Sequence, residues 1–315
     1  MSERRPRVVI AGATGRIGSG LVQALAGQAD VIALSSRADA GSADQVQWLQ
    51  CDGFSIPQTE ISLAGAQVAV FASKARPTGR LTQADLTDLD ILLADTLARA
   101  APLTSVKRLV MYACGERDAR ELVLRRSGLA LSVLRGGDTA AAVKALAALT
   151  LAPEAREIQL PAAPLETVER QVKPAVDVLS VQRFTRPAGW SAADVGFAYF
   201  SWLGDNVPLV KVARFENSLT VHLGGVGVLK LVQNLGRSTA DSCWFDVLDG
   251  ALVNRTRVGR FEFRTLLDGD VMAALVGYSP RLPWLLYRVT QAIAHRLVMH
   301  RFGRWLGEQT GRPAA

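Results

Sequence analysis

Three glycines near the start of the chain have a spacing that could bind a nucleotide. Gly12, Gly15 and Gly18 stand in the stretch VVIAGATGRIGSG, between a β-type run at 7–12 and a helical run. Glycines in such a turn let the backbone approach a pyrophosphate, and the helix start offers free N–H groups and a positive dipole end. The context predicts a dinucleotide cradle, with an empty glycine-rich turn as the alternative. Its residues would be Gly12, Ala13, Thr14, Gly15, Arg16, Ile17 and Gly18.

The end of the next strand bears on which dinucleotide would bind. An acidic residue there would hold the adenosine ribose of NAD, whereas a basic one would take the 2′-phosphate of NADP. The chain has Ser36 and Arg37 at this point and no carboxylate until Asp39. Arg16 can converge on the same phosphate, because a guanidinium fork matches phosphate geometry. The sequence therefore favours NADP(H) over NAD(H), unless Arg37 is simply solvated.

The elements that must position these residues alternate through the first half of the chain. Short apolar runs, typical of buried strands, are separated by helical stretches, including one from Thr82 to about Ala101. This order predicts a doubly wound α/β domain with a parallel Rossmann sheet. The predicted strands are 7–12, 30–37, 46–52, 66–73, 106–114 and 129–137.

The pattern changes near residue 150, where a proline-containing segment begins. A strand, a helix opened by a Ser191–Asp194 cap and several hairpin-spaced strands follow, and a long helix runs from about Pro283 to Leu306. This predicts an α+β domain with a curved antiparallel sheet. The expected domains are 1–155 for the dinucleotide, 156–175 as a transition segment and 176–315 as the second domain.

The first 140 residues resemble the atypical short-chain dehydrogenase/reductase proteins, near their NmrA-like and isoflavone-reductase-like branches. The matching pieces are AGATGRIG, SSR after the second strand, CD after the third, FAS after the fourth, and RELVLRRSGLALSVLRGG. The resemblance implies that Asp52 lies near the adenine and that Ala72 and Ser73 border the dinucleotide. It also implies an oxidoreductase.

The residues for the usual Ser-Tyr-Lys chemistry of that family are absent from the sequence. No YxxxK occurs, and alignment on Glu121 puts Ala113 at the tyrosine position and Arg117 at the lysine position. Arginine cannot replace a lysine whose pKa must be tuned. The candidates left for catalysis are Tyr112, Cys114 and Lys74. Core packing is the competing interpretation for Tyr112 and Cys114, and a solvated loop for Lys74.

The second half resembles the helix-grip domains of START-like and polyketide-cyclase proteins. The resemblance rests on element order and on the stretches GRFEF and YSPRLPWLLYRVTQAIAHRLVMHRFGRWL. It implies a cavity for a bulky apolar ligand.

Within that second domain, side-chain patterns predict which faces are buried. In the last helix, one apolar stripe is predicted at Leu286–Val289–Ile293–Leu297 and another at Tyr287–Ala294–Val298–Trp305, with His300 as a structural histidine and His295 on the polar edge. Arg260, Glu262 and Arg264 alternate with phenylalanines and predict a solvated outer face.

Composition narrows the function further. The net charge is +7, but the basic residues are scattered, so nucleic-acid binding is not expected. Three separated cysteines and three histidines offer no metal site or disulfide framework. No apolar run approaches the roughly 20 residues of a membrane span, and no signal peptide is apparent, so a cytoplasmic location is expected.

The leading hypothesis is an NADP(H)-dependent oxidoreductase acting on a bulky apolar small molecule of a bacterial secondary-metabolite or lipid pathway. Its proton donor would be unusual or water. A non-enzymatic NADP(H) sensor and a redox-neutral cyclase or isomerase are the alternatives. The sequence does not specify the substrate or the oligomeric state.

Overall fold

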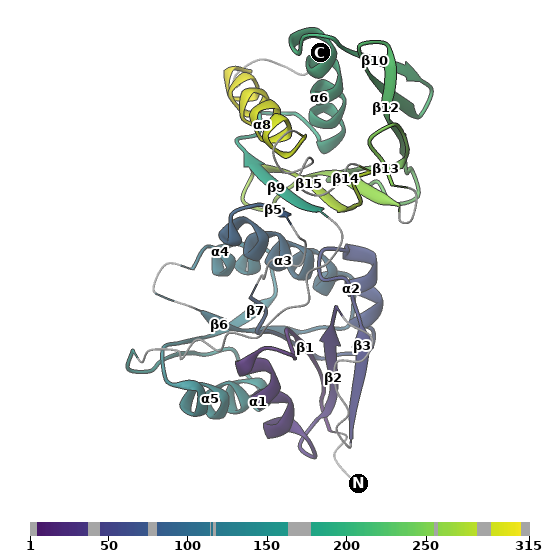
Figure 1. The fold of residues 1–315 in the computed structure, drawn as a ribbon. Coiled ribbons are helices and arrows are strands. Elements are labelled where there is room, and N and C mark those ends of the chain that lie inside the picture. Colours follow the sequence, from purple (N-terminus) through teal and green to yellow (C-terminus); the bar gives the residue numbers. More distant parts are fainter. Residues whose placement is uncertain are drawn as a thin grey trace. The chain divides into compact units, whose positions relative to one another are not determined.

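The computed structural model describes residues 5–36, 45–74, 81–113, 115, 118–162, 178–254, 258–281 and 291–309 (Figure 1). The chain forms two compact units. Unit 1 comprises Met1–Ala75 and Leu89–Arg170, and unit 2 comprises Arg76–Asp88 and Gln171–Ala315. Arg37, Cys114, Glu116 and Arg117 lie outside the described residues.

Unit 1 is built on a parallel sheet, as predicted. Adjacent strands pair in parallel throughout, and the strand order reverses direction between β1 and β4. In such sheets ligands bind at the carboxyl ends of the strands beside this switch point. The order is β3-β2-β1-β4-β6-β7-β8, with bounds β1 Arg7–Ala11, β2 Asp30–Ser35, β3 Val46–Gln50, β4 Val68–Phe71, β6 Arg108–Ala113, β7 Ala130–Arg135 and β8 Glu157–Gln159.

Helices cover both faces of this sheet (Figure 1). On one face lie α1 (Arg16–Leu25) and α5 (Thr139–Leu151), which pack so closely that a Cβ at Gly20 would lie 2.7 Å from a Val143 methyl carbon. On the other lie α2 (Ile56–Ser62), α3 (Leu86–Ala100) and α4 (Ala119–Arg125), with the short 3₁₀ turn η1 (Ala101–Leu103) after α3. The double layer explains why β1 is apolar at consecutive positions rather than at alternate ones.

Unit 2 contains an antiparallel sheet that bends around α6 (Ala192–Asn206), with α8 (Gln291–Glu308) on the same face (Figure 1). Register shifts in β11 and β12 mark bulges, which help a sheet curve. The order is β10-β11-β12-β13-β14-β15-β9-β5, with β5 parallel to β9. The bounds are β5 Leu81–Gln83, β9 Val178–Phe184, β10 Val210–Phe215, β11 Ser218–Leu223, β12 Val226–Gln233, β13 Ser242–Asp249, β14 Gly259–Thr265 and β15 Val271–Tyr278.

The cap predicted at Ser191 is confirmed and begins a helix of 15 residues. The Ser191 hydroxyl accepts a hydrogen bond from the Asp194 amide, and the Asp194 carboxylate accepts one from the Ser191 amide. This capping box satisfies two amide groups at the start of α6. The helix then carries Tyr199 and Phe200 into an aromatic core with Phe261.

The prediction of a solvated charged row on β14 is wrong. Glu262 and Arg264 are both 2% exposed, and the Arg264 guanidinium lies 2.7 Å from a Glu262 carboxylate oxygen. The Ser242 hydroxyl donates to the same oxygen, and Arg260 lies over the Trp244 ring. Alternation shows that two faces differ, but it cannot show which face meets water. Mutual pairing makes the buried charges tolerable.

The prediction of which face of α8 is buried is also wrong. Ile293 and Leu297, expected in the buried stripe, are 60% and 54% exposed. The fully buried side chains are instead those of Met299, Phe302 and Leu306. Of the other expected positions, Ala294 is exposed, Val298 and Trp305 are partly buried, and 286, 287 and 289 lie outside the described residues.

The two histidines of α8 exchange their expected roles. His300 is exposed, whereas His295 is partly buried and its Nε2 lies 3.2 Å from the Ser180 hydroxyl on β9. Burial lowers the pKa of His295 to about 4. Phe302 of α8 packs edge-to-face on Tyr199 of α6, and such aromatic contacts stabilise the helix with this face buried.

Two short strands escaped the sequence prediction. β5 occupies the start of the stretch predicted as a helix, and β8 lies within the segment predicted as a transition. Each has three residues, too few for a periodic signal.

Within the described part of the chain, no helix is long and apolar enough to cross a bilayer.

Candidate functional site

The glycine-rich loop between β1 and α1 forms a tight turn that only glycine can occupy at two of its positions. Gly12 has φ +86°, and a Cβ there would lie 2.6 Å from the Ser73 backbone. A Cβ at Gly18 would lie 2.1 Å from the Gly12 carbonyl oxygen, and the Gly15 amide donates to that same oxygen at 2.9 Å. The loop therefore packs against the backbone that follows β4, and the first turn of α1 packs against the loop at Gly18.

The start of α1 leaves its amide groups available to a ligand. Gly15 is the N-cap and has no side chain to accept from the first-turn amides, and the turn that follows contains no acidic residue. Such a helix start attracts anions through its N–H groups and its dipole. Because a Cβ at Gly12 or Gly18 would collide with backbone, while one at Gly15 would meet only the Gly12 oxygen at 3.2 Å, Gly15 marks the open side of the loop.

An open hollow of about 570 Å³ lies beyond the ends of β2 and β3, lined by Ser36, Gln50, Asp52 and Gln58. The Asp52 amide donates to the Gln58 side chain at 2.9 Å, and the Phe54 amide donates to the Asp52 carboxylate at 3.0 Å. The structure thus brings together Ser36 and Asp52, both predicted site residues. Gln50 and Gln58 were missed, because an isolated glutamine carries no sequence signal of function.

The remaining predicted cofactor residues lie around the same edge of the sheet. Ala72 and Ser73 follow β4 directly, and the Ala72 amide donates to the Ala11 carbonyl at 3.0 Å. Thr14, Arg16 and Ile17 are partly exposed and Ala13 is buried. The position of Arg37 is outside the described residues, so its role stays a prediction.

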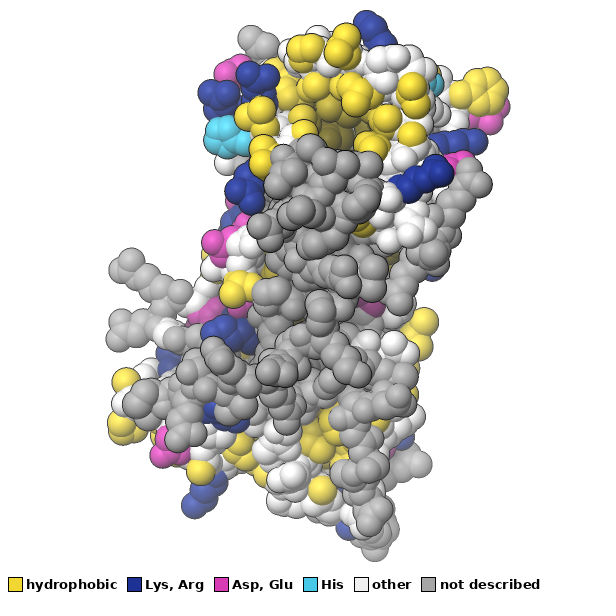
Figure 2. Space-filling model, viewed as in Figure 1, with side chains coloured by type: hydrophobic (Ala, Val, Ile, Leu, Met, Phe, Trp, Pro, Cys, Tyr) yellow, Lys and Arg dark blue, Asp and Glu magenta, His cyan; other side chains and the backbone are white. Residues whose placement is uncertain are grey.

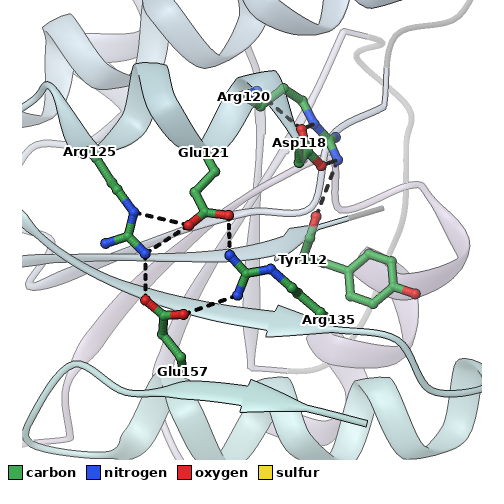
Figure 3. Close-up of polar contacts among 7 residues, drawn as sticks. All are labelled: Tyr112, Asp118, Arg120, Glu121, Arg125, Arg135 and Glu157. Carbon is green, nitrogen blue, oxygen red and sulfur yellow. Dashed lines mark hydrogen bonds and ion pairs between the residues drawn. The ribbon is translucent and has the colours of Figure 1, made fainter. Parts of the chain in front are cut away.

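A buried ion pair that the sequence did not reveal joins the exits of β4 and β6. Arg120 and Asp118 have side chains that are 6% and 7% exposed, with an Nη2–Oδ2 distance of 2.5 Å. Arg120 also donates to the Ser73 carbonyl at 3.0 Å. Figure 3 shows its contacts with Asp118 and with the Tyr112 carbonyl, to which it donates at 3.4 Å. The Asp118 carboxylate accepts from the Arg120 amide as the N-cap of α4. The guanidinium therefore ties the strand that supports the glycine loop to its neighbour.

The three candidate catalytic residues are not brought together as an acid–base group. The Tyr112 ring is buried in the core between the sheet and the α1/α5 layer, with the side chain 8% exposed. Lys74 is exposed in the loop after Ser73, and Cys114 lies outside the described residues. The geometry favours the packing interpretation for Tyr112, because a proton donor must reach a ligand.

Glu121, the acidic residue of the resemblance motif, anchors a ring of four charges rather than a ligand site (Figure 3). Arg125 bridges Glu121 at 2.8 Å and Glu157 at 2.5 Å, and Arg135 pairs with both carboxylates as well. The hydrogen bond from Arg125 lowers the pKa of Glu157. The ring joins α4 to β7 and β8, so this part of the motif holds the edge of the sheet.

A metal centre is not indicated. Among the residues that the structure describes, no group of three or more His, Cys, Asp or Glu side chains is arranged to hold a metal ion.

Comparison with known proteins gives one relative that matches along nearly the whole chain. The auxiliary protein GraX of Staphylococcus aureus is 28% identical over 310 residues, which are 95% of this chain and 92% of GraX. No family profile matches the chain.

Solved structures match mainly over part of the chain. A Rossmann-fold NAD(P)-binding family protein of Shigella flexneri is 15% identical, with a TM-score of 0.42, over 53% of this chain and 98% of its own. The triphenylmethane reductase of Citrobacter sp., solved with NADP(H), is 18% identical with a TM-score of 0.41, over 50% of this chain and 70% of its own.

Proposed function

We propose that unit 1 binds a nicotinamide dinucleotide, NADP(H) in preference to NAD(H), at the carboxyl edge of its sheet. The observation that carries this proposal is the Gly12–Gly15–Gly18 turn, whose open side exposes the uncapped start of α1 beside the strand-order switch. The resemblance to atypical short-chain dehydrogenases adds support from stretches outside the turn, such as SSR after the second strand and CD after the third. The residues present fit the group, because backbone crowds the turn at Gly12 and Gly18 and leaves more room at Gly15, beside the uncapped start of α1.

Separate groups of residues would hold the parts of the dinucleotide in this proposal. The first-turn amides of α1 would hold the pyrophosphate, and Arg16 with Arg37 would hold the 2′-phosphate. Asp52 with Gln50 and Gln58 would take the adenosine end in the hollow, because carboxylate and amide groups match its hydrogen-bonding edges. Ala72 and Ser73 would border the chain of the dinucleotide.

We further propose hydride-transfer chemistry on a bulky apolar small molecule. When bound, the dinucleotide would supply or accept the hydride. Tyr112 packs in the core, so the proton at the substrate oxygen would come from water. A substrate such as a conjugated enone or an iminium ion suits this site, because it needs less acid help at the reacting atom.

A second candidate function is a regulatory protein that responds to NADP(H) without turnover. Two observations favour it. The Tyr112 ring is buried, and the Arg120–Asp118 pair occupies the exits of β4 and β6. The relative that matches along nearly its whole length is itself called an auxiliary protein.

The binding proposal is tested by Gly15→Asp, measured by titration calorimetry with NADPH and NADH. Asp is a favoured N-cap and Gly15 has φ −74°, so the variant should fold with a small shift of the Gly12 carbonyl oxygen, which lies 3.2 Å from the new Cβ. Its carboxylate should fill the anion position and reduce NADPH affinity by on the order of 100-fold, through lost amide contacts and repulsion. Gln23→Asp, an exposed position on the same helix, is the control for added charge. Equal affinity in both variants would refute the loop assignment.

Two further measurements test the preference for NADP(H) and the proposed turnover separately. Arg37→Ala should weaken NADPH binding selectively, and an equal loss for NADH would contradict the phosphate role. Purified protein with NADPH should lose the absorbance of the reduced nicotinamide when an extract of the host is added. Tight binding without such a loss across extract fractions would support the regulatory candidate instead.

A further inference from the structure

The C-terminal helix presents an outer face that no described part of the chain covers. Six side chains make up this face: Ile293, Arg296, Leu297, His300, Arg301 and Arg304. All six are exposed, Ile293 by 60% and Leu297 by 54%. The face lies opposite Met299, Phe302 and Leu306, which bury the helix against the sheet. Basic side chains gather along this side of α8 in Figure 2.

The positive charge of the chain is concentrated in the unit that carries this helix. Unit 2 contains 19 of the 36 Lys and Arg residues and 13 of the 29 Asp and Glu residues, a net charge of +6 out of +7.

The arginines of the chain also differ in how they are neutralised, and paired ones occur in both units. Several arginines of unit 1 pair with carboxylates, as Arg7, Arg99 and Arg120 do. Arg296, Arg301 and Arg304 have no ion pair or hydrogen-bond partner among the described residues. The charge on the outer face of α8 is therefore available to a partner.

The composition of the face selects the kind of partner. A second copy of the chain would bring its own arginines against this face in a two-fold contact, which like charges oppose. The phosphates of a nucleic acid would bind the arginines, but they would leave the apolar side chains of Leu297 and Ile293 exposed to water. An anionic lipid surface satisfies both groups, because phosphate headgroups attract arginine while aliphatic side chains enter the acyl boundary.

We propose that the outer face of α8 docks unit 2 reversibly on an anionic phospholipid surface. The helix, about 27 Å long at 1.5 Å per residue, lies along the surface. Arg296, Arg301 and Arg304 contact headgroup phosphates, and Leu297 and Ile293 enter between the headgroups. The proposal does not depend on dinucleotide binding.

The test is flotation of the full-length protein with vesicles. One set contains equal parts of phosphatidylglycerol and phosphatidylcholine, and the other contains phosphatidylcholine alone. The parent should float with the anionic set only, and less so at high salt. Changing Arg296, Arg301 and Arg304 together to Gln should reduce this binding by on the order of 100-fold, since each cation near the surface contributes about a fivefold factor.

A matched variant separates this face from net charge. Lys144, Lys211 and Lys230 are exposed cations on other elements, and changing all three to Gln removes the same charge. This variant should bind vesicles nearly as the parent does. A second variant, Leu297→Gln, should lower binding about tenfold by removing a side chain that the surface buries. Circular dichroism checks that each variant keeps the parent's secondary structure.

Four results would overturn the proposal. They are failure of the parent to float with anionic vesicles, equal loss in the two triple variants, unchanged binding by Leu297→Gln, and binding of a short DNA duplex that the arginine changes abolish while vesicle binding persists. The last would identify a nucleic-acid face.

Discussion

Replacing Arg120 by Met tests whether the buried ion pair at the strand exits holds the site together. Methionine fills similar space without charge, so the change removes the contacts to Asp118, Ser73 and Tyr112 and leaves the Asp118 carboxylate buried. Both side chains of the pair are less than a tenth exposed, so solvent cannot compensate the lost partner.

The expected cost follows from that burial. Breaking one partner of a buried pair costs about 3 to 5 kcal/mol of unfolding free energy, which lowers the melting temperature of a unit of this size by roughly 10 °C. Asp118→Ser in the Arg120→Met background keeps an N-cap hydroxyl and removes the buried carboxylate, so about half of the loss should return. Freeing the Ser73 carbonyl should also loosen the support of Gly12 and weaken NADPH binding.

The assay can separate the two units. Five of the six tryptophans belong to unit 2, so tryptophan fluorescence reports mainly that unit, whereas circular dichroism reports both. The Arg120 variant should shift the dichroism transition and leave most of the fluorescence transition in place. Arg125→Met, on the same helix but with a side chain 43% exposed, should cost less than about 1 kcal/mol. Two results would refute the reasoning. One is a loss of unfolding free energy in Arg120→Met as small as that in Arg125→Met, and the other is a double variant with Asp118→Ser that is no more stable than Arg120→Met alone.

Three further predictions concern buried polar groups elsewhere. Arg108→Met should cost about 3 kcal/mol in urea unfolding, because the guanidinium caps three carbonyl groups at the end of α5 and burial already lowers its pKa; Arg108→Lys should recover only part of this. Glu262→Gln should destabilise unit 2 by about 3 kcal/mol by removing the buried carboxylate that pairs with Arg264, and Arg264→Met added to it should restore part of the stability, a result that a purely steric effect would not give. The pKa of His295 is lowered to about 4, below its unfolded value, so the unfolded state binds more protons and stability should fall as pH drops from about 6.5 to about 4. The loss should reach roughly 2 to 3 kcal/mol, and His295→Gln should remove most of the pH slope.

Local patterns in the sequence anticipated most of unit 1. The parallel sheet followed from runs such as 7–12, because consecutive apolar residues fit only a strand covered on both faces. The helix cap at Ser191 could also be predicted locally, because its partner Asp194 follows three residues later in the sequence. β5 and β8 could not be predicted, because a three-residue strand is defined by its pairing partner and not by its own periodicity.

The polar site around the strand ends was anticipated only in part. Gly12, Gly15 and Gly18 carry a recognisable spacing, and Ser36 and Asp52 follow predictable strands. Arg120, Gln50 and Gln58 carry no such signal, because their place depends on which strand ends the sheet brings side by side. Tyr112 could not be assigned to catalysis or to the core for the same reason. Its strand shows which side chains share a face, but the sequence does not show which helices cover that face.

By itself, the sequence determined that a glycine turn joins a buried strand to a helix, that a capped helix begins at Ser191, and that two different sheets follow one another. These are local features, set by backbone sterics and by the periods of strand and helix. Only the tertiary structure decided that Glu262 and Arg264 are buried, that His295 rather than His300 contacts β9, and that Ile293 and Leu297 face outward. Those outcomes depend on which surface finds a covering layer, and that choice is made by packing across distant segments of the chain.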